Sequence, residues 1–310
     1  MSNPLRRWAD SFFHVYQKTD LTSWEHAPQD TRPIYGVYHV YCARGWQLLA
    51  SAQLKTLRES GLLAATRKLY VSIIAPSEED VEAFLRLADS DKVELVAIHQ
   101  DPSRYEYPAL EHLQRVAKRE DCLLYYFHTK GISYQSVVTG DRLYRSFLRK
   151  INAWREMLEY FVFEKWQVAV NALSAGYDTY GCYQWPPKAY TMFSGNFWWV
   201  TSDYARRLPS FDPAVILRDR FYSEVWLYQL PHCAFSAFET IADLYFVRMP
   251  RELYRESHPS FWKVRLPFVL TYNWRKLLKH AFGINYKKRC QRRFQRLVAK
   301  GNVNARRWRH

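Results

Sequence analysis

The strongest constraint on the fold is the stretch 121–131, in which six apolar and aromatic residues follow an acid and lead into a polar end. Such a run is typical of a strand buried on both faces, and the helical pattern before it indicates a parallel sheet with crossover helices. Ligands of such sheets bind beyond the carboxyl ends of the strands. His128, Thr129 and Lys130 are expected there, with Gly131 allowing a sharp turn. These side chains suit an anionic ligand, and an ordinary polar strand end is the open alternative.

The rest of the first 130 residues alternates between strand and helix patterns. Strands are expected at 34–40, 69–75, 93–98 and 123–127, and helices at 46–60, 78–88 and 110–118. This alternation predicts an α/β fold with a doubly wound, mostly parallel sheet flanked by helices. Further helices are expected at 4–16, 142–174, 203–208 and 219–229, and a strand at 177–183. The glycine-rich fingerprints of dinucleotide-binding and P-loop proteins do not occur, which weakens both of those interpretations.

A second dense stretch lies at 193–200, where Ser194, Gly195 and Asn196 come before a run of bulky residues. Gly195 would let a ligand approach the backbone, and the Asn196 amide can both donate and accept hydrogen bonds. A bulged strand packed on helices is the alternative explanation of the same pattern.

Cysteine usage and hydropathy indicate the compartment. The five cysteines are scattered and never form C-x-x-C, which argues against a disulfide framework or a zinc site and for a reducing environment. No signal-peptide pattern opens the chain, and the most apolar helical segment, 158–173, contains charged residues that make it too polar to span a bilayer. We therefore expect a cytoplasmic protein.

The net charge of +15 is concentrated at the carboxyl-terminal end. All thirty acidic residues precede residue 257, whereas fifteen of the 45 Lys and Arg residues follow it. The body is thus neutral and the tail is cationic, so the partner of the tail is expected to be anionic, either a membrane surface or nucleic acid. Three segments are predicted: an N-terminal helix and linker at 1–32, the main domain at 33–256 and a basic amphipathic tail at 257–310.

Two helices are expected in this tail, each with a narrow apolar face. The first face comprises Trp274, Leu277, Leu278, Ala281 and Phe282, and the second comprises Cys290, Phe294, Leu297 and Val298. Basic helices of this kind are typical of interfacial helices on anionic lipid, which predicts membrane association through 272–310 on the inner face of the cytoplasmic membrane. A helix docked on the domain and a disordered cationic tail are the alternatives.

Several short motifs resemble those of a family of bacterial polysaccharide glycosyltransferases with a GT-A-like fold. They are Tyr-x-His-Thr-Lys-Gly at 126–131, Trp-Arg-x-Met at 154–157, Phe-Ser-Gly-Asn-Phe-Trp-Trp at 193–199, Tyr-Glu-x-Pro at 105–108 and Glu-x-Trp at 224–226. The resemblance covers roughly residues 33–245. It implies an enzyme, a hexosyltransferase, that moves a sugar from a nucleotide-sugar donor to a hydroxyl of a polysaccharide, lipopolysaccharide or other lipid-linked glycan such as O-antigen.

The resemblance also implies roles for individual residues. The donor diphosphate would be bound by Tyr105, Glu106, His128, Thr129, Lys130, Gly131 and Arg155. Lys130 and His128 would stabilise the departing diphosphate as fixed positive charges. Glu224 would act as general base on the acceptor hydroxyl if stereochemistry inverts, and a salt bridge to Arg220 is its simpler explanation. The acceptor and sugar would contact Ser194, Gly195, Asn196, Trp198, Trp199 and Trp226.

No metal site or cofactor is predicted. Many GT-A enzymes hold a divalent cation with an Asp-x-Asp at the end of the fourth strand, where this chain has His128, Thr129 and Lys130. The literal Asp-x-Asp at 89–91 is expected to be a turn at a helix boundary. Metal-independent transfer is therefore the expectation, although Asp178 or Asp243 would still allow a cation such as Mn or Mg to bind.

The alternative function is a nucleic-acid-binding protein that uses the basic C-terminal arm. The folded body is neutral, and no helix-turn-helix, zinc-finger or RNA-recognition signature occurs in it. We therefore expect no nucleic-acid partner.

Overall fold

The computed structural model describes residues 12–135, 137, 139–187, 189–212, 219 and 221–300. By contacts the chain divides into two compact units. The sheet unit comprises Asp20–Ile132 and Leu158–Ala237, and the helical unit comprises Met1–Thr19, Ser133–Met157 and Phe238–His310. These units cut the chain at other points than the three segments expected from the sequence.

Within the described residues, the sheet unit contains a central sheet of seven strands in the order β10-β6-β9-β5-β2-β3-β4. Their bounds are β2 Ile34–Tyr41, β3 Thr66–Ile74, β4 Val93–His99, β5 Leu123–His128, β6 Thr179–Gly181, β9 Trp198–Thr201 and β10 Ala234–Ser236. All neighbours pair in parallel except β9, which runs antiparallel to both β5 and β6. This confirms the expected α/β class with a mostly parallel sheet, and it is consistent with a GT-A-like fold.

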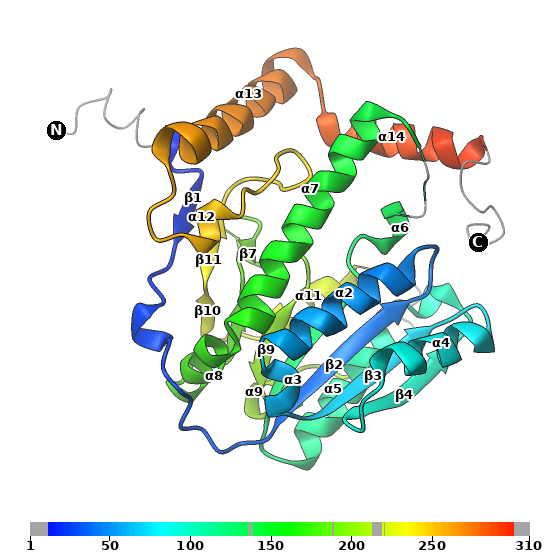
Figure 1. Cartoon of the computed structure of the whole chain (residues 1–310). Helices are drawn as coiled ribbons and strands as arrows, with labels where there is room; N and C mark the ends of the chain where they lie inside the picture. The colour runs from blue at the N-terminus through cyan, green and yellow to red at the C-terminus, as the bar shows by residue number, and fades with distance from the viewer. Residues whose placement is uncertain are drawn as a thin grey trace. The chain divides into compact units, whose positions relative to one another are not determined.

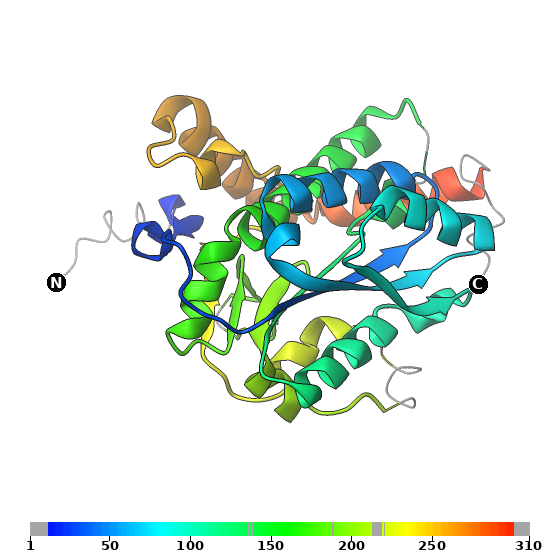
Figure 2. The same ribbon diagram turned by 60° about the horizontal axis from the view of Figure 1, so that its bottom comes forward.

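Helices cover both faces of this sheet (Figures 1 and 2). Their bounds are α2 Trp46–Glu59, α3 Leu62–Ala65, α4 Glu78–Ala88, α5 Tyr107–Arg119, α8 Trp166–Ser174, α9 Ser202–Arg207 and α11 Tyr222–Val225. On one face Tyr38 of β2 bonds to Gln53 of α2 and stacks on Phe127. On the other face β2 and β5 pack beneath α5 and α9 in one large apolar cluster. Side chains of a strand alternate between faces, so the run of buried residues in β2 and β5 follows from this double cover.

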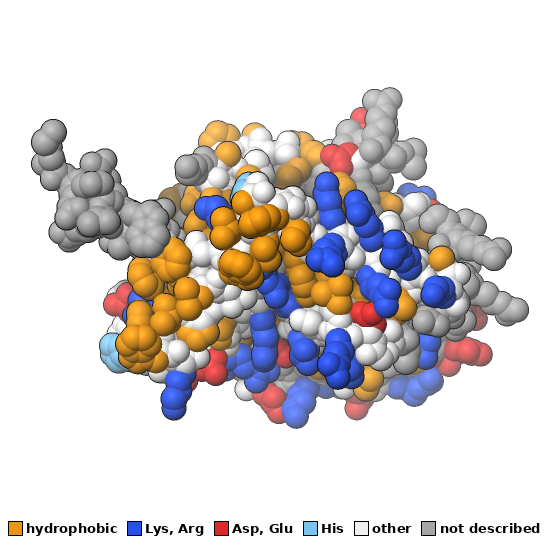
Figure 3. Space-filling model, turned by 90° about the horizontal axis from the view of Figure 1, so that it is seen from above, with side chains coloured by type: hydrophobic (Ala, Val, Ile, Leu, Met, Phe, Trp, Pro, Cys, Tyr) orange, Lys and Arg blue, Asp and Glu red, His pale blue; other side chains and the backbone are white. Residues whose placement is uncertain are grey.

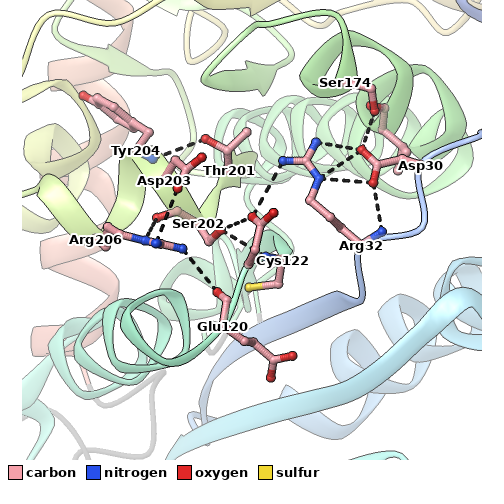
Figure 4. Close-up of polar contacts among 12 residues, drawn as sticks. Asp30, Arg32, Glu120, Cys122, Ser174, Thr201, Ser202, Asp203, Tyr204 and Arg206 are labelled. Carbon is pink, nitrogen blue, oxygen red and sulfur yellow. Dashed lines mark hydrogen bonds and ion pairs between the residues drawn. The ribbon is translucent and has the colours of Figure 1, made fainter.

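The amino edge of the sheet is closed by a polar network (Figure 4). Arg32, just before β2, bonds to Asp30 at 2.6 Å and lies 3.9 Å from Asp121 at the start of β5. The Ser202 hydroxyl donates to Asp121 at 2.8 Å and accepts the Cys122 N–H at 3.0 Å. Burial opposes ionisation of Asp30, yet hydrogen bonds from Arg32 and Ser174 lower its pKa to about 2. The network joins the starts of β2, β5 and α9, so its polar groups serve to hold these elements together.

The long helix expected at 142–174 is interrupted. The chain forms α7 Arg142–Glu159, a π-helical turn at Tyr160–Glu164 (η3) and α8. Four consecutive large side chains, residues 160–163, are buried in that turn, and the Lys165 N–H bonds to the Tyr160 carbonyl five residues back. A regular α-helix buries only one stripe of its side chains. The wider π-helical turn accommodates four consecutive buried side chains, which is more than one stripe contains.

Two other helix predictions were wrong in extent. The segment expected at 219–229 contains only α11 and a 3₁₀ turn at Trp226–Tyr228 (η4), and Arg220 lies outside the described residues. Of the helix expected at 4–16, residues 4–11 lie outside the described residues, and Tyr16–Lys18 forms strand β1. β1 pairs with β11, Phe238–Thr240, because Tyr16 stacks on Phe238 across the two strands.

The remaining short elements of the sheet unit connect this framework. They are η1 Thr22–Trp24, η2 Pro102–Arg104, β7 Gln184–Trp185 and β8 Met192–Phe193. The helical unit is completed by α12 Glu252–Arg255 and a π-helical turn at Phe261–Arg265 (η5), and α6 Ile132–Gln135 starts at the unit boundary. No helix among the described residues is long and apolar enough to cross a membrane.

Both expected tail helices exist, as α13 Leu266–Phe282 and α14 Tyr286–Ala299, and Gly283 in left-handed conformation separates them. The second apolar face is docked, which was one of the alternatives. Cys290 and Leu297 are buried against Phe147 and Ile151 of α7, and Phe294 and Val298 pack beside them. The apolar face of α14 is therefore part of the core of the helical unit.

Candidate functional site

Polar side chains from three distant parts of the sheet unit meet at the carboxyl end of β5. The Glu106 carboxylate, just before α5, accepts a hydrogen bond from the Tyr126 hydroxyl at 2.9 Å and one from the Asn196 amide at 2.5 Å. The Trp198 indole N–H donates to the Asn196 carbonyl oxygen at 2.7 Å. His128 completes the group, with Nδ1 3.7 Å from Glu106 Oε1. We call these five residues the Glu106 cluster.

The backbone conformation of the turn between β8 and β9 favours glycine and asparagine, the two residues found there. Gly195 and Asn196 have φ of 96° and 56°, in the region that glycine and asparagine tolerate best. A Cβ at Gly195 would lie 2.5 Å from Leu158 Cδ1 and 3.3 Å from Lys130 Cε, so a larger residue does not fit. The sharp turn brings the Gly195 carbonyl to 3.1 Å from His128 Nε2.

The lowered pKa of His128 favours a neutral imidazole, which argues against its predicted role as a positive charge. Burial, and then the charge of Lys130, lower its pKa to about 3. Because the Gly195 carbonyl can only accept, Nε2 carries the proton and Nδ1 has a lone pair directed at a carboxylate. The 3.7 Å between Nδ1 and Glu106 Oε1 is too long for a hydrogen bond. These two acceptors therefore suit a ligand with two neighbouring hydroxyls, one of which donates to each acceptor.

His39 was missed by the sequence predictions. It lies beside His128 in the β2–β5 register and beside Ser72 in the β2–β3 register. Burial lowers its pKa to about 4. Among the described residues, neither its Nδ1 nor the Ser72 hydroxyl has a hydrogen-bond partner. The sequence did contain a signal for His39 as a site residue, because it stands at the carboxyl end of a predicted parallel strand, where ligands bind.

The neighbours of His128 along the chain have different environments. The Thr129 hydroxyl is buried and accepts the Tyr41 N–H at 2.9 Å, so it ties β2 to β5. Gly131 has a φ of 78°, which confirms the sharp turn expected there. Lys130 is half-buried beside the Gly195 turn.

Glu224, the other carboxylate predicted for the site, acts electrostatically on the same cluster. The pKa of the Tyr126 hydroxyl is raised by burial, by Glu106 and by the charge of Glu224 on α11. Tyr105, with φ of 45°, is exposed directly before Glu106. Arg155 belongs to the helical unit, where its Nη1 donates to Asn152 at 3.3 Å, and its donor-binding role stays a prediction.

The three tryptophans expected to stack on sugar rings are buried. Trp198, Trp199 and Trp226 are 1%, 0% and 0% exposed. Trp199 and Trp226 donate their indole N–H groups to the carbonyls of Val162 and Pro209. Trp198 and Trp199 fill the core because β9 is a central strand with helices on both faces, and Trp226 of η4 is buried in the apolar cluster that includes α5 and α9. None of the three rings therefore offers a surface for stacking. Ser194 and Asn196 are also buried.

The predicted turn at 89–91 is confirmed, since Asp89 ends α4 and Asp91 precedes β4 at its amino end. Asp178 precedes β6 at the same edge and accepts the Cys233 N–H at 2.8 Å. Asp243, in the helical unit, accepts the Tyr245 N–H at 2.9 Å. Among the described residues, no group of three or more His, Cys, Asp or Glu side chains could hold a metal ion.

Comparisons with known proteins identify no family for the chain. No protein-family model matches it, and no curated protein matches it by sequence. A mannosyltransferase from Pyrobaculum calidifontis, solved in complex with GDP-Man and Mn²⁺, is structurally similar with a TM-score of 0.39 and 14% sequence identity. The match covers 89% of this chain and 71% of that chain.

The two buried histidines predict an acid-sensitive fold. An unfolded histidine has a pKa near 6.5, so between about pH 6.5 and 4 the unfolded chain binds protons that His39 and His128 do not bind when folded. The free energy of unfolding should therefore fall with decreasing pH, by up to about 1.4 kcal/mol per pH unit for each histidine. Urea unfolding at several pH values measures this, and His128→Gln should remove part of the slope. Imidazole NMR signals of both residues titrating near pH 6.5 would contradict the prediction.

Proposed function

We propose that the chain is a glycosyltransferase that moves a hexosyl group from a nucleotide-sugar donor to a hydroxyl of a polysaccharide or lipopolysaccharide glycan. One observation carries the proposal. Three of the motifs by which the sequence resembles that family, at 105–108, 126–131 and 193–199, are joined by direct hydrogen bonds in the Glu106 cluster. They meet at the carboxyl edge of a mostly parallel sheet, where ligands of such sheets bind.

The chemistry of the cluster suits a polyhydroxylated, anionic ligand. The bare Nδ1 of His128 and Oε1 of Glu106 are acceptors for a sugar or ribose hydroxyl. Lys130, beside the Gly195 turn, then supplies the positive charge for the departing diphosphate. His128 acts as a neutral hydrogen-bonding group in this scheme.

Glu224 is proposed as the base that takes the proton of the acceptor hydroxyl. Its charge acts on Tyr126 of β5 and it belongs to α11, which supports a place for it beside the cluster. A carboxylate at this place can accept the proton while the acceptor oxygen attacks the donor sugar, which is the general-base role of an inverting enzyme.

Removing the charge of Lys130 tests the donor side. Lys130→Ala should bind nucleotide sugars more weakly and lose transfer activity by a factor on the order of a hundred, because a fixed charge would be missing where negative charge develops. Donors are first identified by thermal shift against common nucleotide sugars, since a ligand of the folded state raises the melting temperature. Lys68→Ala, which changes a partly exposed lysine of β3 that donates to the Asp91 carbonyl before β4, is the control. Normal turnover in folded Lys130→Ala would remove it from the site.

The same assay tests whether transfer is independent of metal. Activity should persist after dialysis against a chelator and in excess EDTA. Loss of activity that Mn²⁺ or Mg²⁺ restores would replace this part of the proposal with a cation-assisted step.

Glu224→Gln tests the acceptor side. The amide keeps the shape but cannot take a proton, so turnover should fall by a factor of about 10² to 10⁴ while donor affinity stays unchanged. Donor affinity is measured by titration calorimetry on the same preparation. Unchanged turnover, or an equal loss of donor binding, would argue against the base role.

We also propose that α13 attaches the enzyme to the inner face of the cytoplasmic membrane. On the face shown in Figure 3, hydrophobic side chains gather next to Lys and Arg side chains over the C-terminal helices. Trp274, Leu277 and Phe282 of α13 are 58%, 49% and 66% exposed. Exposed apolar side chains flanked by cations suit the surface of an anionic bilayer, where each cation contributes roughly 1 kcal/mol. Such a place suits an enzyme with a lipid-linked acceptor.

Flotation with vesicles tests this attachment. The full-length chain should float with phosphatidylglycerol vesicles and weakly with phosphatidylcholine vesicles, and less at high salt. Trp274→Ser combined with Phe282→Ser should reduce flotation several-fold, whereas Leu48→Ser, which changes a residue of α2 that is 82% exposed, should not. Equal flotation of all variants would contradict the proposal. Tighter binding to duplex DNA or RNA than to vesicles at physiological salt would favour the nucleic-acid function.

A further inference from the structure

The helical unit contains a buried lysine without a carboxylate partner. Lys150 of α7 is 4% exposed, and its Nζ donates to the Ser146 carbonyl at 3.0 Å, the Ser146 hydroxyl at 2.8 Å and the Tyr286 hydroxyl at 2.9 Å. All three acceptors are neutral. Within the described residues Lys150 has no ion pair, so its charge is solvated by dipoles alone, which is a costly arrangement for a buried ion.

A second cation shares the same tyrosine. The Arg275 guanidinium of α13 lies 4.2 Å from the centroid of the Tyr286 ring, and Lys150 Nζ lies 4.6 Å from it. Arg275 Nη1 is buried and has no hydrogen-bond partner among the described residues. Burial, and then the charge of Arg275, lower the pKa of Lys150 to about 8. Two cations that repel each other around one ring, one with an unused donor, leave a local excess of positive charge.

The acids of the helical unit that lie nearby are already engaged. Asp141 bonds to Arg293 at 2.6 Å and accepts the Tyr144 N–H at 2.8 Å. Asp243 lies 3.8 Å from Lys287 and accepts a backbone N–H. Neither neutralises Lys150 or Arg275. In addition, Tyr286 is the first residue of α14, so the positive end of that helix dipole adds to the positive charge near Lys150 and Arg275.

We propose that Lys150, Arg275 and Tyr286 form a binding site for a phosphate group. A phosphate carries more negative charge than a carboxylate, which matches two cations, and its oxygens accept the charge-assisted hydrogen bond that Arg275 Nη1 does not make within the described residues. The phosphate belongs either to the headgroup of an anionic lipid or to a soluble phosphorylated compound. The inference does not depend on the proposed transferase activity, because every residue of the site lies in the helical unit.

Thermal unfolding of the full-length protein with inorganic phosphate, and with chloride at the same ionic strength, tests the site. Phosphate should raise the melting temperature more than chloride does. Arg275→Gln and Lys150→Met should weaken the apparent phosphate affinity on the order of tenfold or more, since each removes a positive charge and the first also removes the unused donor. Lys276→Gln, which removes a neighbouring exposed cation of α13, is the matched control and should respond like the wild type.

Flotation with phosphatidylglycerol vesicles identifies the source of the phosphate. If Arg275→Gln loses both the phosphate response and flotation, while Lys276→Gln keeps the phosphate response and loses clearly less flotation, the ligand is a lipid headgroup. If Arg275→Gln loses only the phosphate response, the ligand is a soluble phosphate compound. The proposal is overturned if the wild type responds equally to phosphate and chloride, or if Arg275→Gln and Lys150→Met keep the wild-type phosphate response.

Discussion

The arrangement of the site depends on one carboxylate. Glu106 stands at the start of α5, yet it accepts hydrogen bonds from β5 through Tyr126 and from the β8–β9 turn through Asn196. A partly buried carboxylate that lost these donors would lose the hydrogen bonds that compensate its charge, so the three segments are held in one geometry. The left-handed Gly195 and Asn196 and the direction of the His128 Nδ1 belong to that geometry, whereas burial and the charge of Lys130 lower the pKa of His128.

Local sequence patterns were sufficient for most of the sheet unit. The unbroken apolar run of β5 identified a doubly covered strand, and the strand-end rule placed His128 and Lys130 at the ligand-binding edge. The same patterns failed where tertiary packing decides. In the sequence, Trp198, Trp199 and Trp226 fit stacking platforms or core positions equally well. The position of β9 inside the sheet made Trp198 and Trp199 core, and packing on Trp198 and Phe211 made Trp226 core. The shift in the pKa of His128 also depends on burial by segments far away in the sequence, which no local pattern reports.

The C-terminal tail is a second case in which the sequence pattern does not decide how side chains pack. The two C-terminal helices have similar apolar stripes in the sequence, but α14 buries Cys290 and Leu297 against α7 whereas α13 leaves Trp274 and Phe282 exposed. The difference arises from the partner of each stripe, since α7 offers α14 a complementary apolar face that includes Phe147. Amphipathicity predicted that each helix has an apolar side, and the structure was needed to assign what covers it.

The reversed direction of β9 has a consequence for how such a protein can diversify. Because β9 runs antiparallel to β5, its first residue lies level with Tyr126, and the chain returns to the ligand-binding edge immediately after the short β7–β8 hairpin. That hairpin contributes no strand to the central sheet, so changes in its length leave the register of β5, β2 and β3 untouched. A change in the length of this hairpin would therefore alter the ligand-binding edge while the framework of the sheet stays the same.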